Sequence, residues 1–165
     1  MASKLSHYDA SGRAHMVDIS GKSASRRVAE ASAFVRLSAE VLQALPNNPK
    51  GNPLEVARIA GISAAKRTAE WIPLCHPLPI THIDVTSRLC KDGVELRSRV
   101  TATAKTGVEM EALVGVTCAA LTVYDMCKAL DKGIEITCVH LLEKTGGKSG
   151  DYRREPAQKR RSAGR

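Results

Sequence analysis

The spacing of hydrophobic positions along the chain predicts alternating helices and strands. Residues 25–45 carry apolar side chains at three- and four-residue spacing, which predicts a helix. In residues 81–89 and 94–102, apolar or small hydroxyl side chains at every second position alternate with polar ones, and Lys91-Asp92-Gly93 lies between the two segments, which predicts a β-hairpin. By the same criteria we expect two more helices and two more strands; they are helices over 53–70 and 111–131, and strands over 16–19 and 134–142.

Capping and breaking residues mark several of these boundaries. Asn52 before Pro53 is typical of a helix start, with Glu55 expected to reach back to the cap. Gly133 is expected to end the helix that begins near Glu111. Prolines exclude regular structure from the segment before the hairpin; they are Pro73, Pro77 and Pro79.

The order of the predicted elements indicates the fold class. When the helix over 53–70 is set aside, the order is β-α-β-β-α-β, the ferredoxin-like pattern. We therefore expect an α+β fold: a ferredoxin-like antiparallel sheet with helices packed on one face, plus an additional helix. Residues 1–152 are expected to form a single domain, and residues 153–165 a basic, disordered tail.

Charge and composition exclude several classes of protein. The chain carries a net charge of +8, but residues 153–165 hold six basic residues against one acid, so the domain itself is only mildly basic. Aromatic residues make up 3% and none falls in the predicted hairpin, which argues against a specific nucleic-acid partner. We expect no membrane association, because no apolar run approaches the roughly 18 residues of a span and no signal peptide precedes the domain. The five cysteines form no C-x-x-C pair, so we expect reduced thiols and a cytoplasmic location.

Two segments combine residues that suit ligand binding. His76 lies on a loop that prolines hold rigid, as a binding residue requires, although a loop histidine beside a buried Cys75 is at least as good an explanation. Gly107 lies between a strand and a helix, where free backbone N–H groups face outward. Glu109 and Glu111 near that helix start bind a ligand or simply satisfy the helix dipole.

The end of the same helix and the last loop offer charged groups. Asp125 and Lys128 are neighbours on one helix face, and they form either a surface ion pair or an acid/base pair. The glycine-rich loop from Lys144 to Gly150 suits phosphate binding or a flexible linker, and it does not match a P-loop. Lys50 on its own indicates little.

Taken together, these segments resemble one family. The chain resembles the cyclic pyranopterin monophosphate synthase family of molybdenum-cofactor biosynthesis over about residues 5–152, and the resemblance is carried by its most distinctive motifs. They are His15-Met16-Val17-Asp18, Ala64-Ala65-Lys66-Arg67-Thr68, Ile72-Pro73-Leu74-Cys75-His76-Pro77-Leu78, Lys105-Thr106-Gly107-Val108-Glu109-Met110-Glu111, Tyr124-Asp125-Met126-Cys127-Lys128 and Gly146-Gly147-Lys148-Ser149-Gly150.

The resemblance implies a reaction and a set of site residues. It implies a lyase that converts 3′,8-cyclo-7,8-dihydro-GTP, made by a radical SAM enzyme, into cyclic pyranopterin monophosphate with release of pyrophosphate. It also implies a homohexamer, a trimer of dimers, with active sites at the dimer interface. Asp125, Lys50 and Lys128 would be catalytic. Leu74, Cys75, His76, Met110 and Glu111 would bind substrate, and Lys66, Arg67, Lys144 and Lys148 are expected to contact its phosphates.

No resident metal and no redox cofactor are expected, with Mg²⁺ on the substrate phosphates as the one alternative. The chain carries no flavin, nicotinamide or iron–sulfur pattern. The rival function is a non-catalytic nucleotide-binding module, which would keep the phosphate lysines but would not require Asp125 beside Lys128.

Overall fold

The computed structural model of the chain describes residues 7–9, 11–148 and 150–155. The expected disordered tail falls largely outside these residues. Within these residues the structure has four α-helices, one 3-10 helix and five strands. In chain order they are β1 (Ser25–Arg36), α1 (Ala39–Ala44), η1 (Leu45–Asn47), α2 (Pro53–Lys66), α3 (Thr68–Trp71), β2 (Ile80–Cys90), β3 (Gly93–Ala104), α4 (Glu109–Cys127), β4 (Glu135–Thr145) and β5 (Tyr152–Arg153).

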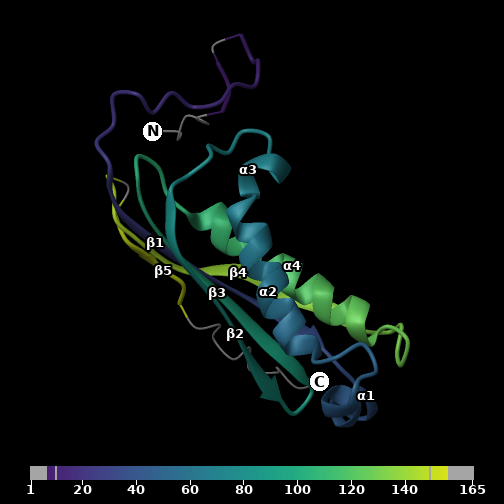
Figure 1. The fold of residues 1–165 in the computed structure, drawn as a ribbon. Helices are drawn as coiled ribbons and strands as arrows, with labels where there is room; N and C mark the ends of the chain where they lie inside the picture. The colour runs from purple at the N-terminus through teal and green to yellow at the C-terminus, as the bar shows by residue number, and fades with distance from the viewer. Residues whose placement is uncertain (1–6, 10, 149, 156–165) are drawn as a thin grey trace, which may run out of the picture.

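The strands form one antiparallel sheet in the order β2-β3-β1-β4-β5. Figure 1 shows α2 and α4 together on one face of this sheet. Without the short β5 at the edge, this is the ferredoxin-like arrangement, with two βαβ halves and the helices on one side. The expected fold class is therefore confirmed, and the additional helical segment corresponds to α1 and η1 after the first strand.

The helix predicted over residues 25–45 is wrong for most of its length, because residues 25–36 form β1, a central strand of the sheet. Every second side chain, from Ala29 through Ala31 and Ala33 to Val35, is fully buried against the helices. Val28 and Ser32 on the other face are also buried, so apolar positions occur on both faces and imitate a helical period. The second predicted helix, over 53–70, is the true first crossover helix of the fold.

Other boundaries also differ from expectation. Residues 16–19 form no strand and belong to an irregular N-terminal segment. α4 ends at Cys127 with Lys128 as its cap, so Gly133 does not terminate it. Arg153, expected in the tail, pairs with Glu143 as part of β5.

The start of α2 is close to prediction. The Asn52 side chain accepts hydrogen bonds from the backbone N–H groups of Leu54 and Glu55, and Pro53 occupies the first turn. Glu55 does not reach back to the cap, because its carboxylate pairs with Arg58 one turn later. The helix itself ends at Lys66, four residues before the expected end, and α3 follows.

α4 is the core helix of the domain. It is long and apolar enough to span a membrane by composition, but half of that stretch is buried inside the molecule. Its buried face consists mainly of small residues, including Ala112, Gly115, Ala119 and Ala120. These small side chains let α4 lie close to both the sheet and α2.

Two glycines mark the closest approach of α2 and α4. A Cβ at Gly61 would lie 2.8 Å from the backbone oxygen of Gly115, and one at Gly115 would lie 2.7 Å from the buried Oγ of Ser98. Neither position has room for a methyl group unless a helix moves.

We therefore predict that Gly61→Ala destabilises the protein by about 1–3 kcal/mol through overpacking, although alanine favours helix by about 1 kcal/mol. Thermal or urea unfolding measures the effect. Gly21→Ala is the control, because a Cβ there meets nothing within 4 Å. Equal stability of Gly61→Ala and wild type would show that the two helices can separate freely.

Candidate active site

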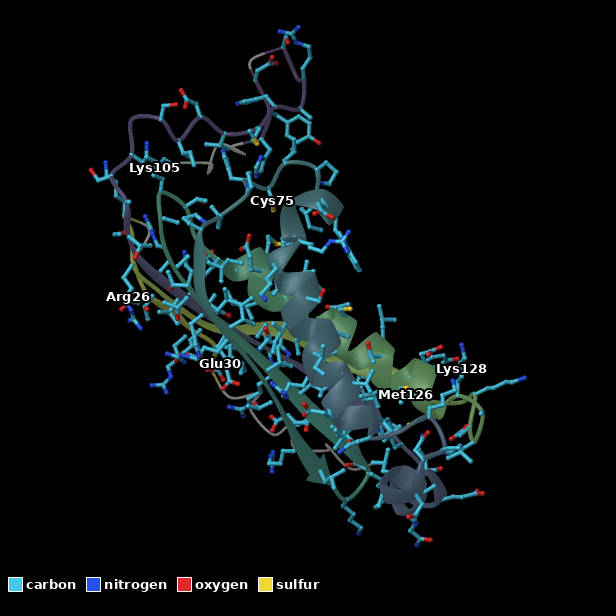
Figure 2. All side chains as sticks on the ribbon, viewed as in Figure 1. Arg26, Glu30, Cys75, Lys105, Met126 and Lys128 are labelled. Carbon is cyan, nitrogen blue, oxygen red and sulfur yellow. The ribbon has the colours of Figure 1, made fainter. Side chains whose placement is uncertain are left out.

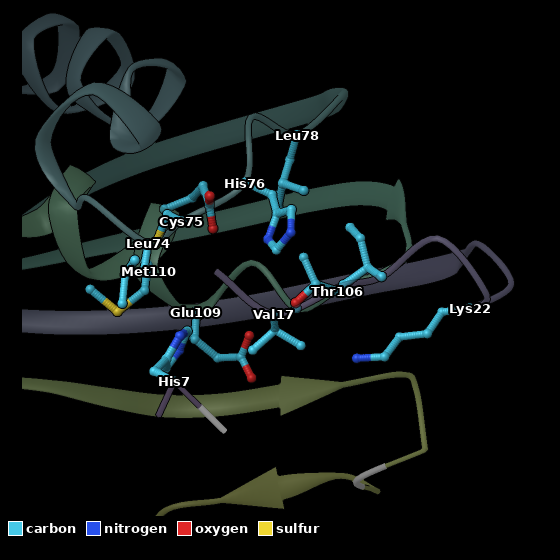
Figure 3. A pocket seen from close by; sticks show the side chains of 13 residues that line it. His7, Val17, Lys22, Leu74, Cys75, His76, Leu78, Thr106, Glu109 and Met110 are labelled. Carbon is cyan, nitrogen blue, oxygen red and sulfur yellow. The ribbon is translucent and has the colours of Figure 1, made fainter. Parts of the chain in front are cut away.

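Five of the expected substrate-binding residues line one cavity of about 320 Å³, which we call the His76 cavity. Leu74, Cys75 and His76 enter it from the proline-containing loop, and Met110 and Glu111 enter it from the first turn of α4. Figure 3 shows most of these side chains converging from the two segments. Residues more than 30 positions apart in the sequence thus line one cavity.

The loop that carries His76 is held in place locally. Its only regular feature is a turn in which the backbone N–H of Cys75 donates to the carbonyl of Ile72 at 3.0 Å. Prolines at 73, 77 and 79 fix the rest of the path. The imidazole is therefore positioned by a stiff backbone and not by a helix or strand.

Several cavity residues were not expected from the sequence. The irregular N-terminal segment supplies Lys22 and His7, as Figure 3 shows, together with Val17 and Ile19. The turn before α4 supplies Thr106, Gly107 and Glu109. Nothing in the spacing of His7 or Lys22 signals this role, because only the path of the irregular segment brings them to the cavity.

A second, smaller cavity of about 150 Å³ adjoins the first, and we call it the Lys144 cavity. The two cavities share Thr106, Gly107 and Glu109. The second cavity adds two cationic side chains, Arg27 and Lys144, and the Lys144 ammonium lies 3.3 Å from the Glu109 carboxylate. Lys148 is exposed on the following turn and is not among the residues that line either cavity.

Lys66 and Arg67 line a third cavity of about 140 Å³ on the other side of His76 and Glu111. The Arg67 guanidinium is paired with Glu70 at 2.8 Å on the protein surface. These two cations therefore reach the neighbourhood of the site, but in this chain they do not line the His76 cavity itself.

Glu111 is the most perturbed acid of the site. The residue is only 3% exposed, and this burial, reinforced by the nearby Glu109 charge, raises the pKa of its carboxyl to about 7. Burial also raises the pKa of the Cys75 thiol, so Cys75 is a neutral thiol near pH 7 and is not an activated nucleophile. Glu111 can thus hold or release a proton near neutral pH.

The three expected catalytic residues lie at the far end of α4. The Lys128 ammonium is 2.6 Å from the Asp125 carboxylate, and Lys50 donates to the backbone oxygen of Asp125 at 3.1 Å. The Lys128 hydrogen bond holds the pKa of Asp125 below its ordinary value, and the same pair raises the pKa of Lys128. Both groups are therefore charged near neutral pH.

This cluster is remote from the His76 cavity in a single chain. Glu111 and Asp125 lie near opposite ends of α4, and at about 1.5 Å per residue they are about 20 Å apart. Figure 2 labels Cys75 near one end of the helix layer and Lys128 at the other. The structure brings the expected residues together as two clusters, not one.

Metal-ligating side chains do not gather around either cluster. Among residues 7–9, 11–148 and 150–155, no group of three or more His, Cys, Asp or Glu side chains is placed to hold a metal ion.

The described part of the chain is thus a ferredoxin-like α+β domain with two adjoining cavities, one of mixed lining and one that combines Arg27 and Lys144 with Glu109. Residues 16–147 match the MoaC family, and the chain belongs to that family. It is 53% identical to the cyclic pyranopterin monophosphate synthase of Corynebacterium efficiens, over 91% of this chain and 98% of that protein. Proteins of the same name from Cereibacter sphaeroides strain KD131 and Thermomicrobium roseum are 53% and 50% identical, over 91% and 95% of this chain and 97% of each relative.

The raised pKa of Glu111 predicts a pH-dependent stability. The folded state holds the Glu111 proton up to about pH 7, whereas the unfolded chain releases it near 4.5, so the folded state binds more protons within this window. The free energy of unfolding should therefore fall as pH rises from about 4.5 to 7, by at most about 3 kcal/mol from this group. Glu111→Gln should lose that decline.

Urea unfolding at pH 5 and pH 8 measures the difference. Glu40→Gln, an exposed position on α1, is the matched control and should keep the wild-type pH dependence. If Glu111→Gln shows the same decline as wild type, Glu111 titrates at an ordinary value in the folded protein.

Proposed function

We propose that this chain converts 3′,8-cyclo-7,8-dihydro-GTP into cyclic pyranopterin monophosphate and releases pyrophosphate, as a step of molybdenum-cofactor synthesis. Membership of the MoaC family and the names of relatives that match over more than nine-tenths of the chain support this. The structural observation that carries it is the convergence of Leu74, Cys75, His76, Met110 and Glu111 on one cavity.

The two joined cavities suit the two parts of this substrate. The heterocycle would lie in the His76 cavity, where the Glu111 carboxyl and the His76 imidazole offer hydrogen-bond donors and acceptors. The triphosphate would extend past Gly107, near the positive end of α4, into the Lys144 cavity. Lys22 and Lys144 would then offset part of the phosphate charge.

The phosphate chemistry needs charge stabilisation more than covalent assistance. A ribose hydroxyl gives up its proton to a basic group while its oxygen attacks the innermost phosphorus. The bond from that phosphorus to the oxygen shared with the second phosphorus breaks, and pyrophosphate carries away the electron pair. Lysine ammonium groups near the departing oxygens lower the energy of that charge. Opening and reclosing the purine-derived ring requires proton transfers, for which Glu111 titrates in a suitable range.

The separation of the two clusters supports a site built from two chains. Lys50, Asp125 and Lys128 cannot reach a ligand in their own chain's His76 cavity across about 20 Å of α4. We propose that the cluster completes the His76 cavity of a partner subunit, in a homohexamer built as a trimer of dimers. Because Lys128 is held as an ammonium by Asp125, its first role would be that of a proton donor.

The proposed reaction also implies a source of substrate, a cellular location and a set of cofactors and partners. The substrate would be supplied by a radical SAM enzyme, and the reaction would take place in the cytoplasm. No redox cofactor or resident metal enters the proposed steps, and Mg²⁺ would act only on the substrate phosphates. We propose that neither nucleic acid nor membrane is a partner of the chain.

Turnover tests the function directly. Purified protein supplied with 3′,8-cyclo-7,8-dihydro-GTP should release pyrophosphate and form the cyclic pterin. Asp125→Asn and Lys128→Arg should fold normally and slow turnover by about 10²–10⁴-fold, because arginine keeps the charge but does not release a proton near neutral pH. Lys132→Arg, an exposed position beyond α4, is the control and should match wild type.

The outcomes separate the roles. Absence of turnover in the wild type would contradict the proposed function. Near wild-type turnover in Lys128→Arg would contradict proton transfer and leave Lys128 as a phosphate-binding charge.

A further inference from the structure

Arg27 joins two turns that leave the sheet at the same end. It lies near the start of β1, which runs between β3 and β4. Its Nε donates to the carbonyl of Ala104, the last residue of β3, at 3.4 Å, and its Nη1 donates to the carbonyl of Gly146, just after β4, at 3.0 Å. One half-buried guanidinium therefore links the ends of two strands that do not pair with each other.

The turn after β4 is shaped around this side chain. Gly147 has a φ of +89°, and a Cβ there would overlap the Arg27 guanidinium. Gly146 has a φ of +93°, and a Cβ there would overlap the backbone oxygen of Arg26. The two glycines thus allow the turn to lie directly on Arg27, which any other residue would prevent.

Both linked turns form walls of the Lys144 cavity. Thr106 and Gly107 follow Ala104 on one side; on the other side Lys144 lies near the end of β4 and Gly146 follows the strand. Lys144 faces Glu109 across the cavity at 3.3 Å. Pairing with β1 holds the backbones of Ala104 and Lys144, and the Arg27 bridge adds a direct link between Ala104 and Gly146, where the two walls continue beyond the strands.

We propose that Arg27 is a positioning residue that sets the width of the Lys144 cavity and so places Lys144 against the substrate phosphates. The inference rests on the proposed function, because it takes the Lys144 cavity as the phosphate site. Arginine suits this role, since its rigid fork donates in two directions at once and it stays charged at every relevant pH.

The test compares four variants of the full chain: Arg27→Gln, Lys144→Ala, the double variant, and Arg26→Gln. KM and kcat are measured with 3′,8-cyclo-7,8-dihydro-GTP, and affinity for inorganic pyrophosphate is measured by calorimetry. Arg27→Gln should raise KM and weaken pyrophosphate binding about 10-fold with kcat within about 3-fold, because contacts to the phosphates persist from ground state to transition state. Arg26→Gln, an exposed neighbour that points to the other face of β1, should match wild type.

The double variant distinguishes positioning from general structural support. If Arg27 acts through Lys144, the double variant should be no worse than Lys144→Ala alone. Multiplicative losses in the double variant, or a KM for Arg27→Gln within about 2-fold of wild type, would overturn the proposal.

Two further readouts keep the inference testable in every case. Gly147→Ala should push the Arg27 guanidinium off the Gly146 carbonyl without removing its charge. This variant should therefore raise KM as Arg27→Gln does, and it replaces Arg27→Gln if that variant fails to fold. An unchanged KM in Gly147→Ala would count against the bridge. If the wild type does not turn over the nucleotide, the proposed function fails, while the pyrophosphate affinities of the same variants still decide the role of Arg27.

Discussion

The packing of α4 is the constraint on which the site depends. Its small buried residues, spread from Glu111 to Cys127, let it pack closely against β1 and α2 along its length. Glu111 and Met110 at its start face the His76 cavity, while Asp125 and its cap Lys128 form the second cluster at its end. Because a rigid helix keeps these groups about 20 Å apart, no movement of side chains alone can unite them in one chain. The two clusters can therefore act on one ligand only if they come from two different chains.

The chemistry of the near cluster follows from burial and from strand ends. Glu111 acquires a pKa near 7 because its side chain, in the first turn of α4, is almost entirely buried and lies near the charge of Glu109. Arg27 and Lys144 line the adjoining cavity, where the chain leaves β3 and β4. The proposed substrate would place its hydrogen-bonding heterocycle in the mixed cavity, which also holds Lys22, and its phosphates toward Arg27 and Lys144.

Hydrophobic spacing predicts the type of a strand correctly where only one of its faces carries buried side chains, and it misleads where both faces carry them. The hairpin of β2 and β3 was predicted nearly to the residue, since Val94, Leu96, Ser98 and Val100 alternate into the core. The spacing in β1 imitates a helix because Val28 and Ser32 are buried on the face away from the helices as well, and because its alanines carry a strong helix propensity. The alternation of Ala29, Ala31, Ala33 and Val35 was the signal that would have identified it. His7, Lys22 and Arg27 reach the site only through long-range folding, which spacing along the chain does not encode.

If the two ends of α4 from two different chains complete one proposed active site, mixed oligomers of two inactive variants should regain turnover. Lys50→Ala and His76→Ala protein should each be inactive alone, and random reassembly should restore about a quarter of the wild-type rate, since half of the dimers are mixed and one of their two sites is intact. His76→Ala mixed with Glu111→Ala should recover nothing, because both side chains line the same chain's cavity. Absence of recovery in verified mixed oligomers of the first pair would contradict the two-chain site.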